Sequence, residues 1–217
     1  MDYILHGYWR SSATYRVRIA LNLKQIPYRY VPVHLVKEGG EQYSADYTAL
    51  NPAQLVPTLI NEAEDVMLNQ SLSIIEYLDE TVPDICPLIP SHRVERARVR
   101  ALAQDIACDM QPIVNLRVLN ALRDGFQAND DDVKRWAQKW VVKGFDSIEK
   151  RLQTQAGKFC FDFNVSLADV CLVPQVYNAK RFGVDMTMYP LISKIYDNCQ
   201  ALDAFQKAAP EAQSDAI

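Results

Sequence analysis

One stretch near the start of the chain decides its fold: YILHGY at residues 3–8, then SSAT at 11–14 and YRVRIALNLK at 15–24. The first segment is short and rich in aromatic and β-branched residues, which favours a strand. Val17, Ala20, Leu21 and Lys24 then recur at helical spacing. The stretch therefore predicts a strand, a polar turn and a helix.

The next part of the chain continues this pattern. We expect a strand at 28–35, a short helix at 42–50, a hairpin of strands at 58–61 and 66–69, and a helix at 71–80. Pro32 lies inside the second strand, which fits an edge position better than a central one. The resulting order, βαβαββα, is that of a thioredoxin-like domain.

Beyond these elements the composition changes. Pro83, Pro87 and Pro90 interrupt the pattern and mark a linker. Helices are expected after it at 93–109, 113–126, 131–153, 166–179 and 190–206. The sequence thus predicts an α/β plus all-α chain, with a thioredoxin-like domain at 1–82 and an all-helical domain at 91–217.

Composition narrows the class of protein. With 49% hydrophobic and 23% charged residues the chain is expected to be globular, and its formal charge of -4 argues against a nucleic-acid binder that neutralises phosphates. No apolar run reaches the roughly 18 residues that a membrane helix needs, and the start does not resemble a secretion signal. Five scattered cysteines without a CxxC pair suit reduced thiols, and the three histidines are equally dispersed. We expect a cytoplasmic protein without a metal site.

Three places could hold a ligand. The turn at Ser11-Ser12 leads into a helix, whose unpaired N–H groups and dipole stabilise an anion such as a thiolate. A proline in the position of Pro57 is usually cis in a thioredoxin-like fold, so that Val56 can pair with an extended peptide. The helix start at Gln70-Ser71 could hold a carboxylate. Plain helix capping and an ordinary trans proline remain the alternatives.

At these residues the sequence resembles a known family. SSATYRVRIAL at 11–21 looks like the SSCxWRVRIAL signature of zeta-class glutathione transferases, the class that includes maleylacetoacetate isomerase. The resemblance continues through ALNP at 49–52, VPTL at 56–59, QSL at 70–72 and LADVCLVPQV at 167–176. It implies the glutathione transferase fold and glutathione as cofactor.

The resemblance also implies roles for individual residues. Ser11 and Ser12 would donate hydrogen bonds to the glutathione sulfur, beside Ala13. Gln42 would hold the glycyl end, and Val56, followed by Pro57, would pair with the cysteinyl backbone. Gln70 and Ser71 would bind the γ-glutamyl carboxylate. The residues that correspond to pocket-lining positions of the family are Gln111, Asn115, Leu116 and Arg117.

Two features bear on the chemistry. Ala13 replaces the family's cysteine, so a mechanism that needs that thiol is excluded, and glutathione would be the nucleophile. The expected substrates are dicarboxylates, and guanidinium groups bind carboxylates in a bidentate manner. Arg10, Arg117 and Arg181 are the candidates, with a solvated surface arginine as the alternative for each.

The sequence therefore predicts a glutathione-dependent cis-trans isomerase that converts maleylacetoacetate to fumarylacetoacetate in tyrosine catabolism. A maleylpyruvate isomerase is the nearest alternative, since Gln111 resembles the first group of enzymes and Arg117 the second. A transferase that conjugates glutathione to α-haloacids and a glutathione-binding protein without catalytic activity are the others. Because the family is dimeric, we expect a homodimer.

Overall fold

The computed structural model describes residues 2–216, which form two compact units. The first unit comprises the residues up to Pro87 together with those from Leu202 onward, and the second comprises Leu88–Ala201. The elements of the first unit are β1 (Tyr3–Gly7), α1 (Ser12–Leu23), β2 (Tyr28–Pro32), η1 (Lys37–Gly39), η2 (Glu41–Tyr43), α2 (Ala45–Leu50), β3 (Thr58–Asn61), β4 (Val66–Asn69), α3 (Ser71–Thr81), α10 (Asp203–Ala208) and η5 (Pro210–Ala212).

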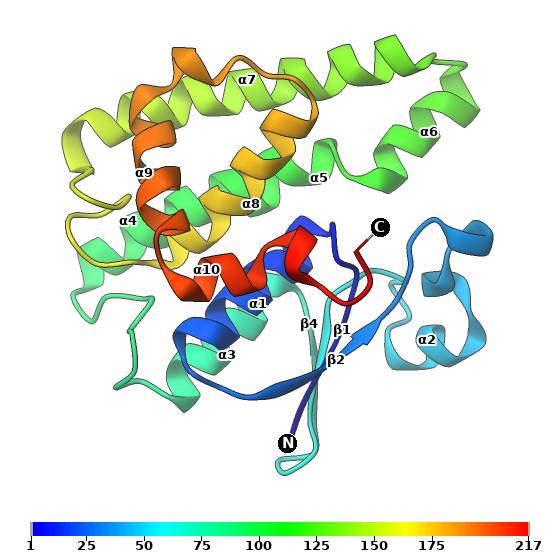
Figure 1. Ribbon diagram of the computed structural model, residues 1–217, viewed down its shortest axis with the longest axis horizontal. Helices are drawn as coiled ribbons and strands as arrows, with labels where there is room; N and C mark the ends of the chain where they lie inside the picture. Colours follow the sequence, from blue (N-terminus) through cyan, green and yellow to red (C-terminus); the bar gives the residue numbers. More distant parts are fainter. Residues whose placement is uncertain (1, 217) are drawn as a thin grey trace. The chain divides into compact units, whose positions relative to one another are not determined.

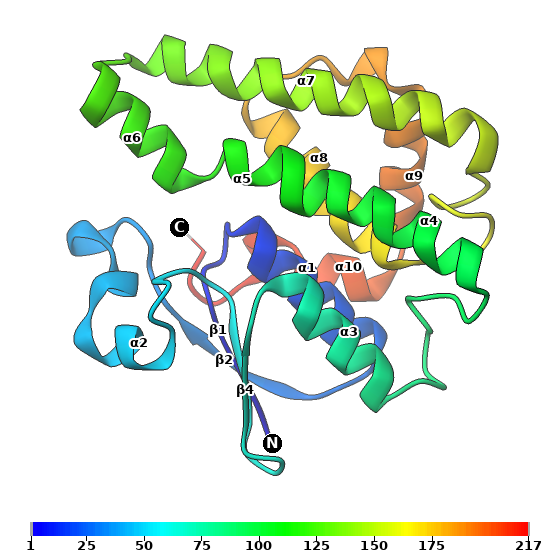
Figure 2. The same ribbon diagram turned by 180° about the vertical axis from the view of Figure 1, so that it is seen from behind.

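A four-stranded sheet in the order β2-β1-β3-β4 forms the centre of the first unit. β1 pairs in parallel with β2 and antiparallel with β3, and β3 pairs antiparallel with β4. The helices α1 and α3 lie side by side (Figure 2). This arrangement confirms the thioredoxin-like order expected from the sequence, including the edge position of the strand that carries Pro32.

The core of the first unit contains three buried cations, Arg16, Arg18 and Lys24, besides its apolar side chains. Leu5, Leu59 and Ile74 are at most 1% exposed. Lys24, at the end of α1, forms an ion pair of 2.5 Å with Asp79 on α3 and donates a hydrogen bond to the carbonyl of Val82. The side chain of Lys24 is 0% exposed, so this pair joins the two helices within the protein interior.

The second unit is helical. Its elements are α4 (Arg93–Gln104), the π-helical segment η3 (Asp105–Met110), α5 (Gln111–Ile113), α6 (Leu116–Phe126), α7 (Asp130–Gln155), α8 (Leu167–Arg181), η4 (Met186–Met188) and α9 (Pro190–Gln200). α8 packs against α4 and α9 and is buried along most of its length. The first α-helix expected here ends at Gln104, five residues earlier than predicted, because the backbone continues as a π-helix.

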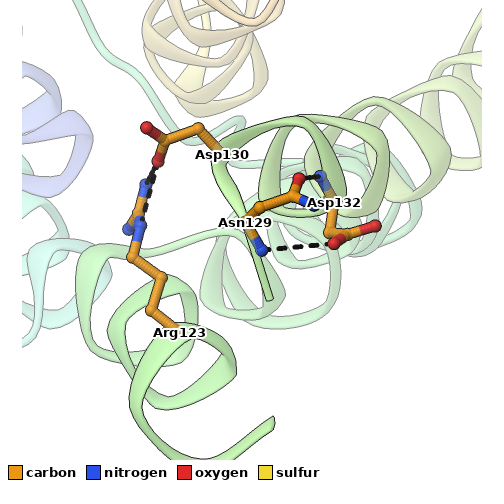
Figure 3. A network of polar contacts seen from close by, with 4 residues as sticks. All are labelled: Arg123, Asn129, Asp130 and Asp132. Atoms are coloured by element: carbon orange, nitrogen blue, oxygen red, sulfur yellow. Dashed lines mark hydrogen bonds and ion pairs between the residues drawn. The ribbon is translucent and has the colours of Figure 1, made fainter. Parts of the chain in front are cut away.

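Capping boxes mark the start of two helices of the second unit, α7 and α8. Asn129 and Asp132 form a capping box at the start of α7, and Arg123 on α6 forms an ion pair of 3.0 Å with Asp130 (Figure 3). Ser166 and Asp169 form the same motif at the start of α8. Burial raises the pKa of Asp169, and hydrogen bonds from the N–H groups of Cys160 and Ser166 partly offset this.

The end of the chain differs from the prediction. The helix expected at 190–206 ends at Gln200, and α10 begins at Asp203. α10 packs on α1 (Figure 1), because Arg18 donates a hydrogen bond to the carbonyl of Ala208 and Asn22 donates one to the carbonyl of Ala204. The segment from Leu202 onward thus belongs with the first unit, whereas the sequence analysis placed it in a helical domain at 91–217.

Candidate functional site

The strand pairing brings the three predicted ligand positions to one edge of the sheet, namely the edge formed by the ends of β1 and β4 and the start of β3. In the register of the sheet His6, near the end of β1, faces Thr58 at the start of β3, and Thr58 faces Asn69 at the end of β4. The Val56-Pro57 pair and the helix start at Gln70-Ser71 directly adjoin these strand ends, and the turn at Ser11-Ser12 follows the end of β1 after three residues. Segments that are far apart in the sequence therefore meet at this edge.

Ser11 is the N-cap of α1. Its side-chain oxygen accepts a hydrogen bond of 3.2 Å from the N–H of Thr14. A serine hydroxyl has one hydrogen to donate besides its acceptor sites, so capping the helix leaves that hydrogen available for a ligand. The first turn of α1 contains no acidic residue, and Ser12 in that turn is buried. The turn is therefore suited to stabilising a bound anion.

Val56 presents backbone groups at the same edge. The bond between Val56 and Pro57 is cis. Within residues 2–216 the N–H and C=O groups of Val56 take part in no hydrogen bond. The segment before Thr58 is held from α2, because the Tyr47 hydroxyl donates to the carbonyl of Leu55 over 2.7 Å and lies 3.0 Å from Thr58 Oγ1. An extended peptide could pair with Val56.

Gln70 and Ser71 lie where β4 gives way to α3. Gln70 has a φ of 67°, a conformation that a residue other than glycine keeps only where its surroundings impose it. Its side chain does not cap α3, and the first turn of that helix has no acidic residue. Ser71 is buried, and its hydroxyl oxygen accepts a hydrogen bond of 2.9 Å from Arg16 on α1. These groups and the helix dipole favour a carboxylate.

Gln42 lies in η2, which follows β2. Its side chain is buried, and Nε2 donates a hydrogen bond of 3.3 Å to the carbonyl of Leu35. Oε1 has no hydrogen-bond partner among the described residues. A buried polar atom without a partner costs free energy unless a ligand or water satisfies it. The primary amide of Gln42 is thus able to pair with a peptide group of a ligand.

Two residues that the sequence analysis did not single out shape the turn before Ser11. Arg18 is 0% exposed, and its guanidinium donates to the carbonyls of Tyr8 and Trp9 over 3.5 and 2.9 Å. Gly7 allows α1 to approach the strand, since a Cβ there would lie 2.2 Å from Thr14 Cγ2. Two arginines, Arg16 and Arg18, alternate with apolar residues in α1, and this is the sequence signal that could have indicated Arg18.

Arg10 lies within this turn, directly before Ser11. It is half-buried, and its guanidinium lies over the ring of Trp9 at 5.2 Å from the ring centroid. Stacking on an aromatic face leaves the edge of a guanidinium free to bind a carboxylate in a bidentate manner. The structure therefore places an arginine one residue before the turn that could hold an anion.

The remaining predicted residues lie in the second unit. Gln111 begins α5, and Asn115 caps α6 by accepting a hydrogen bond of 3.2 Å from the N–H of Val118. Leu116 begins α6 and Arg117 follows it, exposed to solvent. Arg181 lies elsewhere, at the end of α8, where it is exposed and its guanidinium covers the ring of Phe182 at 4.4 Å.

Three further features concern metal binding, membrane spans and disulfides in the described residues. Residues 2–216 contain no cluster of three or more histidine, cysteine or acidic side chains able to hold a metal ion. None of the helices in this range is sufficiently long and apolar to cross a membrane. The five cysteines, all within this range, form no disulfide.

Comparison with known proteins agrees with these observations. Residues 5–85 match the family model described as "Glutathione S-transferase, N-terminal domain". The chain is 53% identical over 217 residues to a probable maleylacetoacetate isomerase of Vibrio cholerae, and the alignment covers 100% of this chain and 99% of that protein.

Solved structures extend the comparison. The holo structure of a maleylpyruvate isomerase, described as a bacterial zeta-class glutathione S-transferase, has a TM-score of 0.94 and 44% identity, covering 99% of this chain and 100% of that one. A maleylacetoacetate isomerase of Methylobacterium extorquens AM1 with bound malonate and glutathione has a TM-score of 0.93 and 38% identity, covering 99% of each chain.

Proposed function

This chain belongs to the glutathione S-transferase family and to its zeta class, and on that premise we propose that it is a glutathione-dependent cis-trans isomerase that converts maleylacetoacetate to fumarylacetoacetate. The observation that carries the proposal is the convergence of Ser11, Val56 and Ser71 at one edge of the sheet. Their donors and acceptors match the thiol, the peptide backbone and a carboxylate of a tripeptide.

The residues present fit glutathione. Gln42 has a buried Oε1 atom without a partner among the described residues, as a group that pairs with the glycyl end requires. Val56 offers backbone groups to the cysteinyl residue. The start of α3 with Gln70 and Ser71 suits the γ-glutamyl carboxylate. When bound, glutathione supplies a thiol whose reversible addition to a double bond allows rotation about that bond.

The turn before α1 lowers the energy of the anionic sulfur. Ser11 donates its hydroxyl hydrogen while its oxygen remains the cap of the helix, and Ser12 contributes from the first turn. The helix dipole adds to these hydrogen bonds. Ala13 has no ionisable group, so the turn orients and stabilises the sulfur and contributes no nucleophile of its own.

Arginines recognise the dicarboxylate. Arg10, Arg117 and Arg181 are the groups proposed to bind the two carboxylates and to stabilise the negative charge that develops beside the substrate carbonyl. The bound malonate in the relative from Methylobacterium extorquens supports a dicarboxylate as the ligand class. On a chain with a formal charge of -4, such local cations are needed to attract a dianion.

Maleylpyruvate is the second candidate substrate, favoured by Arg117 and by the 44% identity to a maleylpyruvate isomerase. The deciding experiment measures turnover of both substrates by the purified chain with substoichiometric glutathione. We expect maleylacetoacetate to be isomerised with a higher kcat/KM while free glutathione stays constant. A strong preference for maleylpyruvate would contradict the assigned substrate, and stoichiometric loss of glutathione would indicate a conjugating transferase.

We also propose that the enzyme is a cytoplasmic homodimer. The resemblance to a dimeric family supports the dimer, and cysteines that form no disulfide suit a reducing compartment. Light scattering after size-exclusion chromatography tests the assembly, with twice the chain mass of 24.7 kDa expected. A species of a single chain mass at micromolar concentration would contradict it.

A further inference from the structure

The turn that delivers Ser11 is held at its backbone from several sides. The N–H of Ser11 donates to the carbonyl of Tyr8 over 3.0 Å and closes the turn. Arg18 binds the carbonyls of Tyr8 and Trp9 from within the core. All of these hydrogen bonds are accepted by the carbonyl groups of Tyr8 and Trp9. None of them involves the N–H of Trp9, which has a different partner.

That partner comes from the end of the chain. Asp215 Oδ2 accepts a hydrogen bond of 3.0 Å from the N–H of Trp9 and one of 3.3 Å from the hydroxyl of Tyr30 on β2. The two bonded residues Trp9 and Asp215 are 206 positions apart. Figures 1 and 2 both show the red C-terminal segment beside the dark blue turn between β1 and α1.

Hydrogen bonds that do not involve the Asp215 side chain close the turns of its own segment. The 3-10 helix η5 and the amide of Gln213, which donates to the carbonyls of Lys207 and Ala209, close the turns of the C-terminal segment. Within residues 2–216 the Asp215 carboxylate accepts hydrogen bonds only from Trp9 and Tyr30. Its contact with the turn is therefore additional to what holds the segment together.

Arg18 and Asp215 carry opposite charges on the two sides of this contact. Burial lowers the pKa of Arg18, whereas the nearby Tyr30, Tyr28, Tyr15 and Asp215 raise it. Tyr30 and Tyr15 also present their rings to the Arg18 guanidinium. Arg18 and Asp215 thus hold the C=O and the N–H of one residue, Trp9, with opposite charges that stabilise each other.

We propose that Asp215 is a positioning residue for the reaction: its hydrogen bond to the N–H of Trp9 sets the turn that places Arg10 and Ser11. The proposal rests on the function assigned above, since it gives the C-terminal segment a part in activating the glutathione thiol. Loss of the bond lets the turn move away from the geometry in which Ser11 donates to the sulfur, and small displacements of such a donor reduce catalysis strongly.

The test compares Asp215→Ala with Asp215→Asn. In each glutathione complex the pKa of the bound thiol is measured from the ultraviolet absorbance of the thiolate as a function of pH, and kcat and KM are measured alongside it. We expect Asp215→Ala to raise the thiol pKa by about one unit and to lower kcat about tenfold at neutral pH, with recovery at higher pH. Asp215→Asn should stay within about twofold of wild type, because the amide oxygen still accepts from Trp9.

A matched control removes the same charge elsewhere in the segment. Asp203→Ala, at the exposed start of α10, should leave the thiol pKa and kcat unchanged. If Asp215→Ala fails to fold, Asp215→Glu carries the test, since it keeps the charge but displaces the acceptor by one methylene and should shift the thiol pKa in the same direction.

Three results would overturn the inference: an unchanged thiol pKa in the Ala variant, an unchanged thiol pKa in the Glu variant, or an Asn variant as impaired as the Ala variant. The thiol titration requires only glutathione binding. A wild-type protein that binds glutathione and isomerises neither substrate therefore refutes the assigned reaction alone, whereas failure to bind glutathione refutes both proposals.

Discussion

Arg16 on α1 donates a hydrogen bond of 2.9 Å from Nη1 to the hydroxyl oxygen of Ser71, the first residue of α3. Both residues are buried. The bond links the helix that begins beside the proposed thiol site to the helix start that is proposed to bind the γ-glutamyl carboxylate. It also brings a guanidinium close to that helix start, where a positive charge favours an anionic ligand.

Ser71→Ala should weaken glutathione binding. The variant removes a hydroxyl at the start of α3 and the acceptor of the Arg16 bond, so we expect the KM for glutathione to rise about tenfold, equivalent to about 1.4 kcal/mol. Ser73→Ala, an exposed serine on the same helix, is the matched control and should leave the KM unchanged. Equal KM values in the two variants would remove Ser71 from the binding site.

Ser11→Ala should impair thiol activation. Removing one hydrogen-bond donor to a reacting anion lowers kcat by about a hundredfold, and the pKa of bound glutathione should rise. Loss of the N-cap costs about 1 kcal/mol of unfolding free energy as well.

Asn129→Ala separates these two effects, because it removes the N-cap of α7 and touches none of the proposed site residues. It should lower the unfolding free energy by a similar amount while kcat stays at the wild-type value. Undiminished isomerisation by Ser11→Ala would refute the role of that serine.

Arg117→Ala and Arg181→Ala should affect the dicarboxylate and not the cofactor. Loss of a carboxylate contact should raise the KM for the dicarboxylate about tenfold or more, while the KM for glutathione stays constant. Arg98→Ala, an exposed arginine on α4, is the control for a general change in surface charge. An identical effect of all three variants would show that bulk charge, and not a specific contact, attracts the substrate.

Lys24→Met should destabilise the first unit strongly. It leaves the Asp79 carboxylate without its cation, and breaking a buried ion pair typically costs about 3–5 kcal/mol. Urea unfolding measures the loss. The double variant Lys24→Met/Asp79→Leu should recover most of it, because no uncompensated charge remains.

The exposed pair between Arg123 and Asp130 provides the comparison, since its side chains are 40% and 90% exposed. Arg123→Ala should change the unfolding free energy by at most about 1 kcal/mol. An equally small loss in Lys24→Met would show that the pair in the core contributes no more than one at the surface.

His6 should make the protein less stable in mild acid. Burial, followed by the charge of Arg29, lowers the pKa of His6 from 6.5. Just below that value the unfolded chain binds a proton that folded His6 does not, so the unfolding free energy falls as the pH falls and is regained as the pH rises.

His6→Gln should therefore reduce the loss of unfolding free energy between about pH 7 and about pH 5. Measuring both proteins at about pH 8, where the imidazole is neutral in both states, isolates any change in packing. A pH dependence in His6→Gln as steep as in wild type would assign the acid sensitivity to other groups.

Much of the fold could be predicted because it is encoded locally. The residues 3–24 contain a strand pattern, a polar turn and a helical repeat, and the structure has β1 and α1 there. The capping box at Ser166 is equally local, since its partner Asp169 is three residues away. The expected helix over 190–206 was wrong for the opposite reason: the break after Gln200 follows from packing on α1 and not from a local pattern.

The sequence by itself therefore determined the order of the elements from β1 to α3, the family, and the three segments with donors and acceptors for a tripeptide. Tertiary structure alone decided that these segments share one edge of the sheet and that the turn before Ser11 is held by Arg18 and Asp215. The physical reason is distance along the chain. Arg18 and Ala208 are 190 positions apart, and contacts of that kind depend on which surfaces bury each other, which no local periodicity records.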